Sequence, residues 1–159
     1  MQIATGCKQI KEIFPIGDGP TYIVPIYQRP YTWEESNITD FLNDINVEND
    51  GYYIGNVLLI EKIDHNNSNI KIQEIVDGQQ RLTSIALILI AIFYKLHGFI
   101  SSVTRNQLSD LFTIQSDIKR KLTNENNSVY ALRLLKKDSI VFNAIFEFIT
   151  EKSIFDKFD

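Results

Sequence analysis

Apolar residues recur along the chain at two spacings, and each spacing predicts a kind of element. The β-branched runs over 54–63 and 69–76 predict two strands joined by a polar turn. The long apolar run that follows predicts a buried helix over about 79–97, stopped by Gly98. The sequence therefore alternates strand and helix signals within a short span.

The remaining segments give weaker signals of the same two kinds. Helices are predicted over 7–14, over 33–47 with Thr32 and Glu35 as a capping box, and over 138–150. Pro25 and Pro30 exclude a helix over 21–33 and favour an edge strand that runs into a loop. We expect a strand over 129–135, and one or two short helices with a flexible loop over 101–128. The predicted class is α+β, with a small mixed sheet covered by helices.

Composition narrows the class of protein. At 159 residues and 44% hydrophobic content, the chain suits a single domain over 1–159. A net charge of −4 gives no general attraction to nucleic acid or membranes. Cys7 is the only cysteine, and the N-terminus lacks the pattern of a signal peptide. The most apolar run is far shorter than the roughly 20 residues of a membrane span, so we expect a cytoplasmic protein without membrane contact.

The stretch "EIVDGQQRLTS" carries the first candidate chemistry. Asp77 ends a predicted strand, Gly78 permits a tight turn, and Gln79, Gln80 and Arg81 enter the helix. Free N–H groups at a helix start bind anions, whereas an arginine there opposes the helix dipole unless an anion is bound. A guanidinium pairs with phosphate through two hydrogen bonds.

A structural role is the alternative for the same stretch. Asp77 and Gln80 also fit a variant capping box, and Arg81 could pair with Asp77 or Glu74. We expect Arg81→Ala to abolish nucleotide binding and leave the fold intact, because an exposed arginine in the first turn of a helix stabilises little unless it is paired. The residues alone leave both readings open.

A second segment, "VPIYQRPYTW", again joins a glutamine to an arginine. Gln28 and Arg29 stand between Tyr27 and Tyr31 in a loop bounded by prolines. Such a loop suits phosphate pairing by Arg29 and base stacking by the tyrosines. For Trp33 we prefer a core position. We expect Arg29 and Arg81 to converge on one pocket.

Three segments in order, "IYQRPYTW", "YYIGNVLLIE" and "EIVDGQQRLTSI", resemble the signature segments of the GmrSD-type family of modification-dependent (type IV) restriction proteins. Their N-terminal domain, marked by a DGQQR motif, has a ParB/sulfiredoxin-like fold. The resemblance implies a domain that binds and hydrolyses nucleoside triphosphates with Mg²⁺ and couples this to sensing modified DNA in defence against phage.

Carried over by position, the resemblance assigns roles to individual residues. Asp77, Arg81 and Arg29 are the candidate catalytic residues, with Asp77 also a candidate Mg²⁺ ligand. The candidate nucleotide-binding residues are Gly78, Gln79, Gln80, Arg81, Gln28, Arg29 and Gly55. Candidate DNA contacts in the second segment are Tyr27 and Tyr31. The basic cluster Lys119, Arg120 and Lys121 is a further candidate DNA contact from its charge alone, and the alternative for such a charge run is a solvated face.

Relatives usually add a His-based nuclease domain, which this chain lacks. His65 and His97 have no partner at metal-ligand spacing. We therefore expect the N-terminal part of a longer protein, or a protein whose nuclease is a separate subunit, with no DNA cleavage by this chain alone. The competing function is a non-hydrolysing, nucleotide-switched DNA-binding or partition-like module. A sulfiredoxin-like reductase is set aside, because Cys7 lies outside the anion loop.

Overall fold

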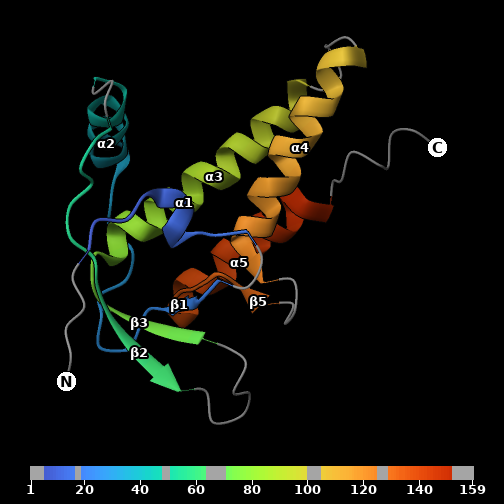
Figure 1. Cartoon of the computed structure of the whole chain (residues 1–159). Helices are drawn as coiled ribbons and strands as arrows, with labels where there is room; N and C mark the ends of the chain where they lie inside the picture. Colours follow the sequence, from blue (N-terminus) through green and yellow to red (C-terminus); the bar gives the residue numbers. More distant parts are fainter. Residues whose placement is uncertain are drawn as a thin grey trace.

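The computed structural model describes residues 6–16, 19–47, 51–63, 71–99, 105–124 and 129–151. These residues form an α+β domain, which confirms the predicted class (Figure 1). In chain order the elements are α1 (Ile10–Ile13), β1 (Thr21–Ile23), α2 (Glu35–Val47), β2 (Leu58–Ile63), β3 (Lys71–Asp77), α3 (Gln79–Phe99), α4 (Arg105–Leu122), β4 (Thr123–Asn124), β5 (Val129–Tyr130), β6 (Leu132–Arg133) and α5 (Lys136–Glu151).

The main sheet is small and mixed, in the order β2-β3-β1-β6. Strands β2 and β3 form the predicted antiparallel pair, with Ile60 opposite Glu74. Strand β1 runs parallel to β3 on one side and to β6 on the other. Strands β4 and β5 form a separate two-stranded sheet.

The position of β1 corrects one prediction. The proline-bounded segment was expected to form an edge strand, but β1 pairs on both sides and lies inside the sheet. The strand stops at Ile23, before Pro25, so the missing proline N–H removes no bond from the ladder. Tyr22 and Val24 donate their backbone N–H groups to Ala131 and Arg133 across the β6 side.

Helix α3 begins beside the end of β3, and α3 and α4 run side by side (Figure 1). The core lies between the sheet and the helices. Fully or almost fully buried side chains include Phe14, Ile75, Leu82 and Leu132. The buried Tyr22 hydroxyl donates to the carbonyl of Ile13 at 2.8 Å, and burial raises the pKa of Tyr22 to about 12, so this phenol stays neutral.

Helix α4 corrects a second prediction. The polar region after residue 100 was expected to hold short helices, but a single helix of 18 residues spans Arg105–Leu122. Its buried side chains Gln115, Ile118 and Leu122 follow helical spacing, and most of its exposed described side chains are polar, with Ile114 (47% exposed) as an apolar exception. This narrow buried stripe holds α4 against α3, because the Gln115 side chain also donates a hydrogen bond to the carbonyl of Phe93 in α3.

Several element boundaries differ from the predictions. Helix α2 begins at Glu35, where the Asn37 side chain accepts the N–H of Glu34, so Thr32 and Glu35 do not form the capping box. The strand predicted from residue 54 begins at Leu58, and the strand predicted over 129–135 is divided between β5 and β6. The predicted helix over 7–14 is reduced to α1, and α3 continues through Gly98 to Phe99.

Some predictions fall on residues outside the described ranges. They include most of the flexible loop predicted over 123–128 and the polar turn that holds His65. Within the described ranges, no helix is both long and apolar enough to cross a membrane. The ParB/sulfiredoxin-like part of the fold prediction stays a prediction.

Candidate anion-binding site

The site is centred on the junction between β3 and α3. Gly78 has φ of +90°, a left-handed conformation that glycine adopts without strain. Its carbonyl accepts the first helical hydrogen bond, from Leu82 N–H at 3.0 Å, so Gly78 is the N-cap residue. The N–H groups of Gln79, Gln80 and Arg81 therefore belong to the helix's first turn, where they lack intrahelical acceptors.

The two Gln-Arg segments are tied to each other by their glutamines. Gln28 Nε2 donates to the carbonyl of Val76 at 2.7 Å, and Gln79 Nε2 donates to the carbonyl of Arg29 at 2.9 Å. Gln80 uses both ends of its amide: Nε2 donates to Pro30 O at 3.1 Å, and Oε1 accepts Thr32 N–H at 2.8 Å. These bonds hold the loop over 28–32 against the start of α3.

A pocket of about 260 Å³ lies where the two segments meet. Arg29 and Arg81 both border it, although 52 residues separate them in sequence. Arg29 is exposed, and its guanidinium has no hydrogen bond or ion pair with any described residue. The full lining is Gln28, Arg29, Trp33, Asp77, Gly78, Gln79, Gln80 and Arg81.

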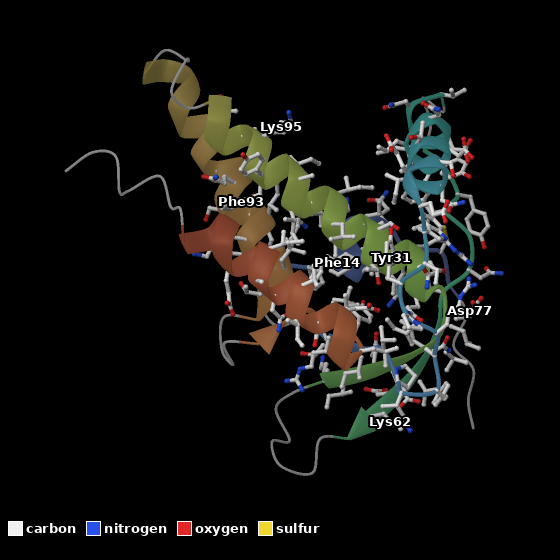
Figure 2. All side chains as sticks on the ribbon, turned by 180° about the vertical axis from the view of Figure 1, so that it is seen from behind. Phe14, Tyr31, Lys62, Asp77, Phe93 and Lys95 are labelled. Atoms are coloured by element: carbon white, nitrogen blue, oxygen red, sulfur yellow. The ribbon has the colours of Figure 1, made fainter. Side chains whose placement is uncertain are left out.

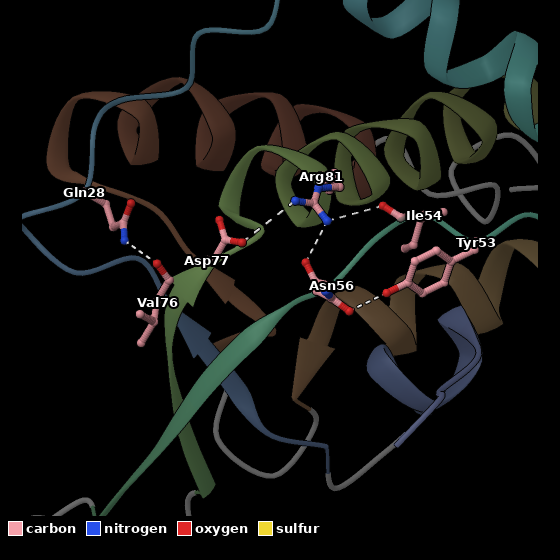
Figure 3. Close-up of polar contacts among 7 residues, drawn as sticks. All are labelled: Gln28, Tyr53, Ile54, Asn56, Val76, Asp77 and Arg81. Carbon is pink, nitrogen blue, oxygen red and sulfur yellow. Dashed lines mark hydrogen bonds and ion pairs between the residues drawn. The ribbon is translucent and has the colours of Figure 1, made fainter. Parts of the chain in front are cut away.

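Arg81 is more constrained than the sequence suggested. Its Nη1 donates to the carbonyls of Asn56 at 2.6 Å and Ile54 at 3.4 Å, and its side chain is only 27% exposed (Figure 3). Asp77 Oδ2 lies 4.0 Å from Nη2, at the outer limit of an ion pair. The assumption of an exposed, unpaired Arg81 is therefore wrong, because the loop before β2 supplies acceptors for it.

The structure also decides between the structural alternatives for this stretch. The Gln80 amide is occupied by Pro30 and Thr32, so the Asp77–Gln80 capping box does not form. Of the two carboxylates considered for Arg81, Asp77 is the near one. Glu74 instead accepts the hydroxyl of Tyr27 at 2.9 Å and pairs with Lys62 at 3.7 Å.

The aromatic residues of the second segment divide into anchors and exposed groups. Tyr31 is half-buried: its hydroxyl shares a hydrogen bond with Ser84, and its N–H donates to Asp138. Tyr27 is 64% exposed, and its hydrogen bond to Glu74 raises its pKa, which keeps the phenol protonated. Figure 2 shows Tyr31 and Asp77 on the side of the molecule where α3 begins.

Trp33 contacts both the core and the pocket, and only the core contact was predicted from the sequence. It packs edge-on against Phe41 at 5.5 Å between ring centroids, as expected of a core residue. It also borders the pocket. Ile54 and Asn56 were missed as well, because they act through backbone carbonyls, and the one sequence signal for them was the glycine between them.

The basic cluster Lys119, Arg120 and Lys121 lies apart from the pocket. Lys121 donates to the carbonyl of Phe14 at 3.0 Å, and Arg120 pairs with Asp117 at 3.9 Å, both near the C-terminal end of α4. Neither residue, nor Lys119, lines the pocket. In the part of the chain that the structure describes, no three His, Cys, Asp or Glu side chains gather at metal-binding distance.

The fold and the pocket define an α+β domain with two arginines beside the first turn of a long helix. The chain belongs to the family of the N-terminal domain of the GmrSD restriction endonuclease, whose family model matches residues 10–158. It is thus a module of the restriction-system class. A search of curated proteins gave no match.

Proposed function

We propose that this domain binds a nucleoside triphosphate with Mg²⁺ in the pocket at the start of α3 and hydrolyses it, as the sensor module of a modification-dependent restriction system. The observation that carries the proposal is the shared pocket. Two guanidinium groups from distant segments border the same helix N-terminus.

Phosphate recognition follows from the groups that remain free. The N–H groups of the first helical turn and the positive end of the dipole favour an anion. Arg29 contributes a guanidinium without a described partner, and Arg81 has no hydrogen bond through Nη2 or Nε, although Asp77 Oδ2 lies 4.0 Å from Nη2, at the outer limit of an ion pair. Paired with phosphate oxygens, the two arginines would stabilise charge that develops during phosphoryl transfer.

The residues present also fit Mg²⁺. This ion is usually held by one or two carboxylates, phosphate oxygens and water, and Asp77 is the pocket's single carboxylate. The Asp77 side chain is 68% exposed, which leaves it free to hold the ion through water or to orient the attacking water. When bound, Mg²⁺ would neutralise charge on the phosphates.

One orphaned polar atom is consistent with a ligand that carries donors. Gln79 is 5% exposed, and its Oε1 is buried without a hydrogen-bond partner among the described residues. An unsatisfied buried acceptor costs about 1–3 kcal/mol. A metal-bound water could satisfy it.

The size of the pocket indicates which part of the nucleotide it takes. Pockets for drug-sized ligands usually measure about 300–1,000 Å³. At about 260 Å³, this pocket suits the phosphate chain, with the nucleoside toward the solvent. Trp33 at the rim offers an indole on which a base can stack.

Modified DNA is the second proposed partner, and the exposed Tyr27 is the better candidate contact. It lies in the same loop as Arg29 and presents most of its ring to solvent. Tyr31 is less suited, since both its hydroxyl and its N–H are in use. The alternative, a nucleotide-switched DNA-binding module without hydrolysis, uses the same pocket and differs only in phosphate release.

The test uses Trp33, the only tryptophan of the chain, as a reporter. We expect its fluorescence to change saturably on titration with at least one NTP and Mg²⁺, and phosphate to be released under the same conditions. Asp77→Asn should keep binding and lose most of the phosphate release. Saturable binding without release would support the alternative module, and no response to any of the four NTPs would refute the proposal.

A further inference from the structure

The loop over 51–57, between α2 and β2, lies against Arg81. Two of its carbonyls, from Ile54 and Asn56, accept hydrogen bonds from the single atom Nη1 (Figure 3). An Nη carries two hydrogens, so both are directed to the loop. The opposite edge of the guanidinium, Nη2 and Nε, is the edge that can pair bidentately with phosphate.

Gly55, between those two carbonyls, makes this contact possible. Its φ is +95°, and a Cβ built on it would overlap Arg81 Nη1 and lie 3.2 Å from Cζ. No other side chain fits there without displacing the guanidinium. The absence of a side chain at Gly55 therefore makes room for the Arg81 guanidinium, rather than for a ligand that approaches the backbone.

Two tyrosine hydroxyls of the loop over 51–57 make hydrogen bonds that hold this loop in place. The Tyr53 hydroxyl donates to Asn56 Oδ1, and the Tyr52 hydroxyl donates to Asp44 in α2 at 2.9 Å. The loop also packs closely on Gly78, because a Cβ built there would lie 2.9 Å from Val57 Cγ2. The loop is therefore in direct contact with the residue at which α3 begins. A change at Arg81 thus has a short physical route to Tyr53, which is 66% exposed.

We propose that Gly55 is a positioning residue for nucleotide binding: it lets the loop over 51–57 hold Nη1 of Arg81 so that the Nη2–Nε edge faces the phosphate chain. This inference rests on the proposed function. Because coupling between two sites is reciprocal, phosphate bound to Arg81 also stabilises the loop, and so reports the occupied pocket to the surface around Tyr52 and Tyr53.

The sequence provides a matched control for the test. Gly51 lies in the same loop with φ of +103°, yet a Cβ there meets nothing within 4 Å. Gly51→Ala and Gly55→Ala therefore impose similar backbone strain, and only Gly55→Ala displaces Arg81. The probes are ATP, GTP, CTP and UTP, each with Mg²⁺, and inorganic tripolyphosphate, followed by Trp33 fluorescence.

We expect Gly55→Ala to weaken binding about tenfold or more, because it misplaces a bidentate contact, while Gly51→Ala stays within about twofold of the wild type. Hydrogen exchange should show the amides of 52–57 becoming more protected on binding in the wild type and in Gly51→Ala, and not in Gly55→Ala. Equal affinities and equal protection in the two variants would overturn the inference.

Failure of the inference is distinguishable from failure of the proposed function. If the wild type binds none of the probes, both fall together. If it binds, and Gly55→Ala binds as tightly as Gly51→Ala, only the positioning role falls. Should Gly55→Ala not fold, hydrogen exchange of the wild type and Gly51→Ala decides: the amides of 52–57 should become more protected when a probe binds, and unchanged protection of these amides in the bound wild type would overturn the inference.

Discussion

Arg29→Ala should lose nucleotide affinity by roughly 10- to 150-fold, the range that corresponds to hydrogen bonds with charged groups. The Arg29 side chain is exposed and borders the pocket, and its guanidinium has no hydrogen bond or ion pair with a described residue. The guanidinium therefore has no partner within the described residues to give up when phosphate binds. Calorimetric titration of the purified variant measures the loss.

The same substitution should leave stability almost unchanged, within about 0.5 kcal/mol, as is usual for exposed residues. Arg133→Ala is the matched control, because Arg133 is also exposed but lies on β6, outside the pocket lining. It should alter neither affinity nor melting temperature. Equal affinities of Arg29→Ala and Arg133→Ala would show that the anion does not bind between the two Gln-Arg segments.

Leu82→Ala should lower the free energy of unfolding by about 2–5 kcal/mol, which is a large part of the roughly 5–15 kcal/mol that holds a typical domain. Leu82 is fully buried in the first turns of α3, and its N–H makes the bond that fixes Gly78 as the N-cap. Truncation leaves a cavity in the core at the start of α3. The melting temperature should fall by roughly 4–20 °C.

Ile140→Ala controls for the general effect of removing an aliphatic side chain from a helix. Ile140 lies in α5 and is 66% exposed, so its truncation should change stability little. Chemical denaturation of both variants makes the comparison. A loss in Leu82→Ala no greater than in Ile140→Ala would mean that the α3 start is not packed as described.

The sequence predicted that Arg29 and Arg81 border one pocket, but it did not predict the contacts inside that pocket. The glycine after Asp77 and the repeated Gln-Arg pair were enough to predict that two segments approach one helix N-terminus, and they line one pocket. What the glutamines do there was not predictable. Gln79 and Gln80 bond backbone carbonyls 50 residues away, and backbone acceptors leave no mark in a sequence.

The misplaced elements have a similar origin. Prolines in a segment favour an edge strand, but β1 ends before Pro25, so local propensity did not conflict with a central position. Helix α4 was underestimated because its buried stripe is narrow and includes the polar Gln115, whose amide donates to the carbonyl of Phe93 in α3. The position of β1 in the sheet and the length of α4 both depend on contacts with residues far away in the sequence, and such contacts cannot be seen in a local pattern.

Arg81 shows the same limit at the scale of one side chain. The sequence suggested a free arginine whose removal would affect nucleotide alone. The structure gives it two carbonyl partners, so Arg81→Ala would disturb the loop over 51–57 together with the phosphate contact. Arg29→Ala is the cleaner substitution for this reason.

The most direct test of the central claim is a crystal structure of this domain with Mg²⁺ and a non-hydrolysable triphosphate analogue. The account predicts phosphate oxygens within hydrogen-bonding distance of the Arg29 guanidinium, the Arg81 Nη2–Nε edge and the N–H groups at the start of α3. An analogue bound on another face of the domain, with both arginines turned away from its phosphates, would contradict it.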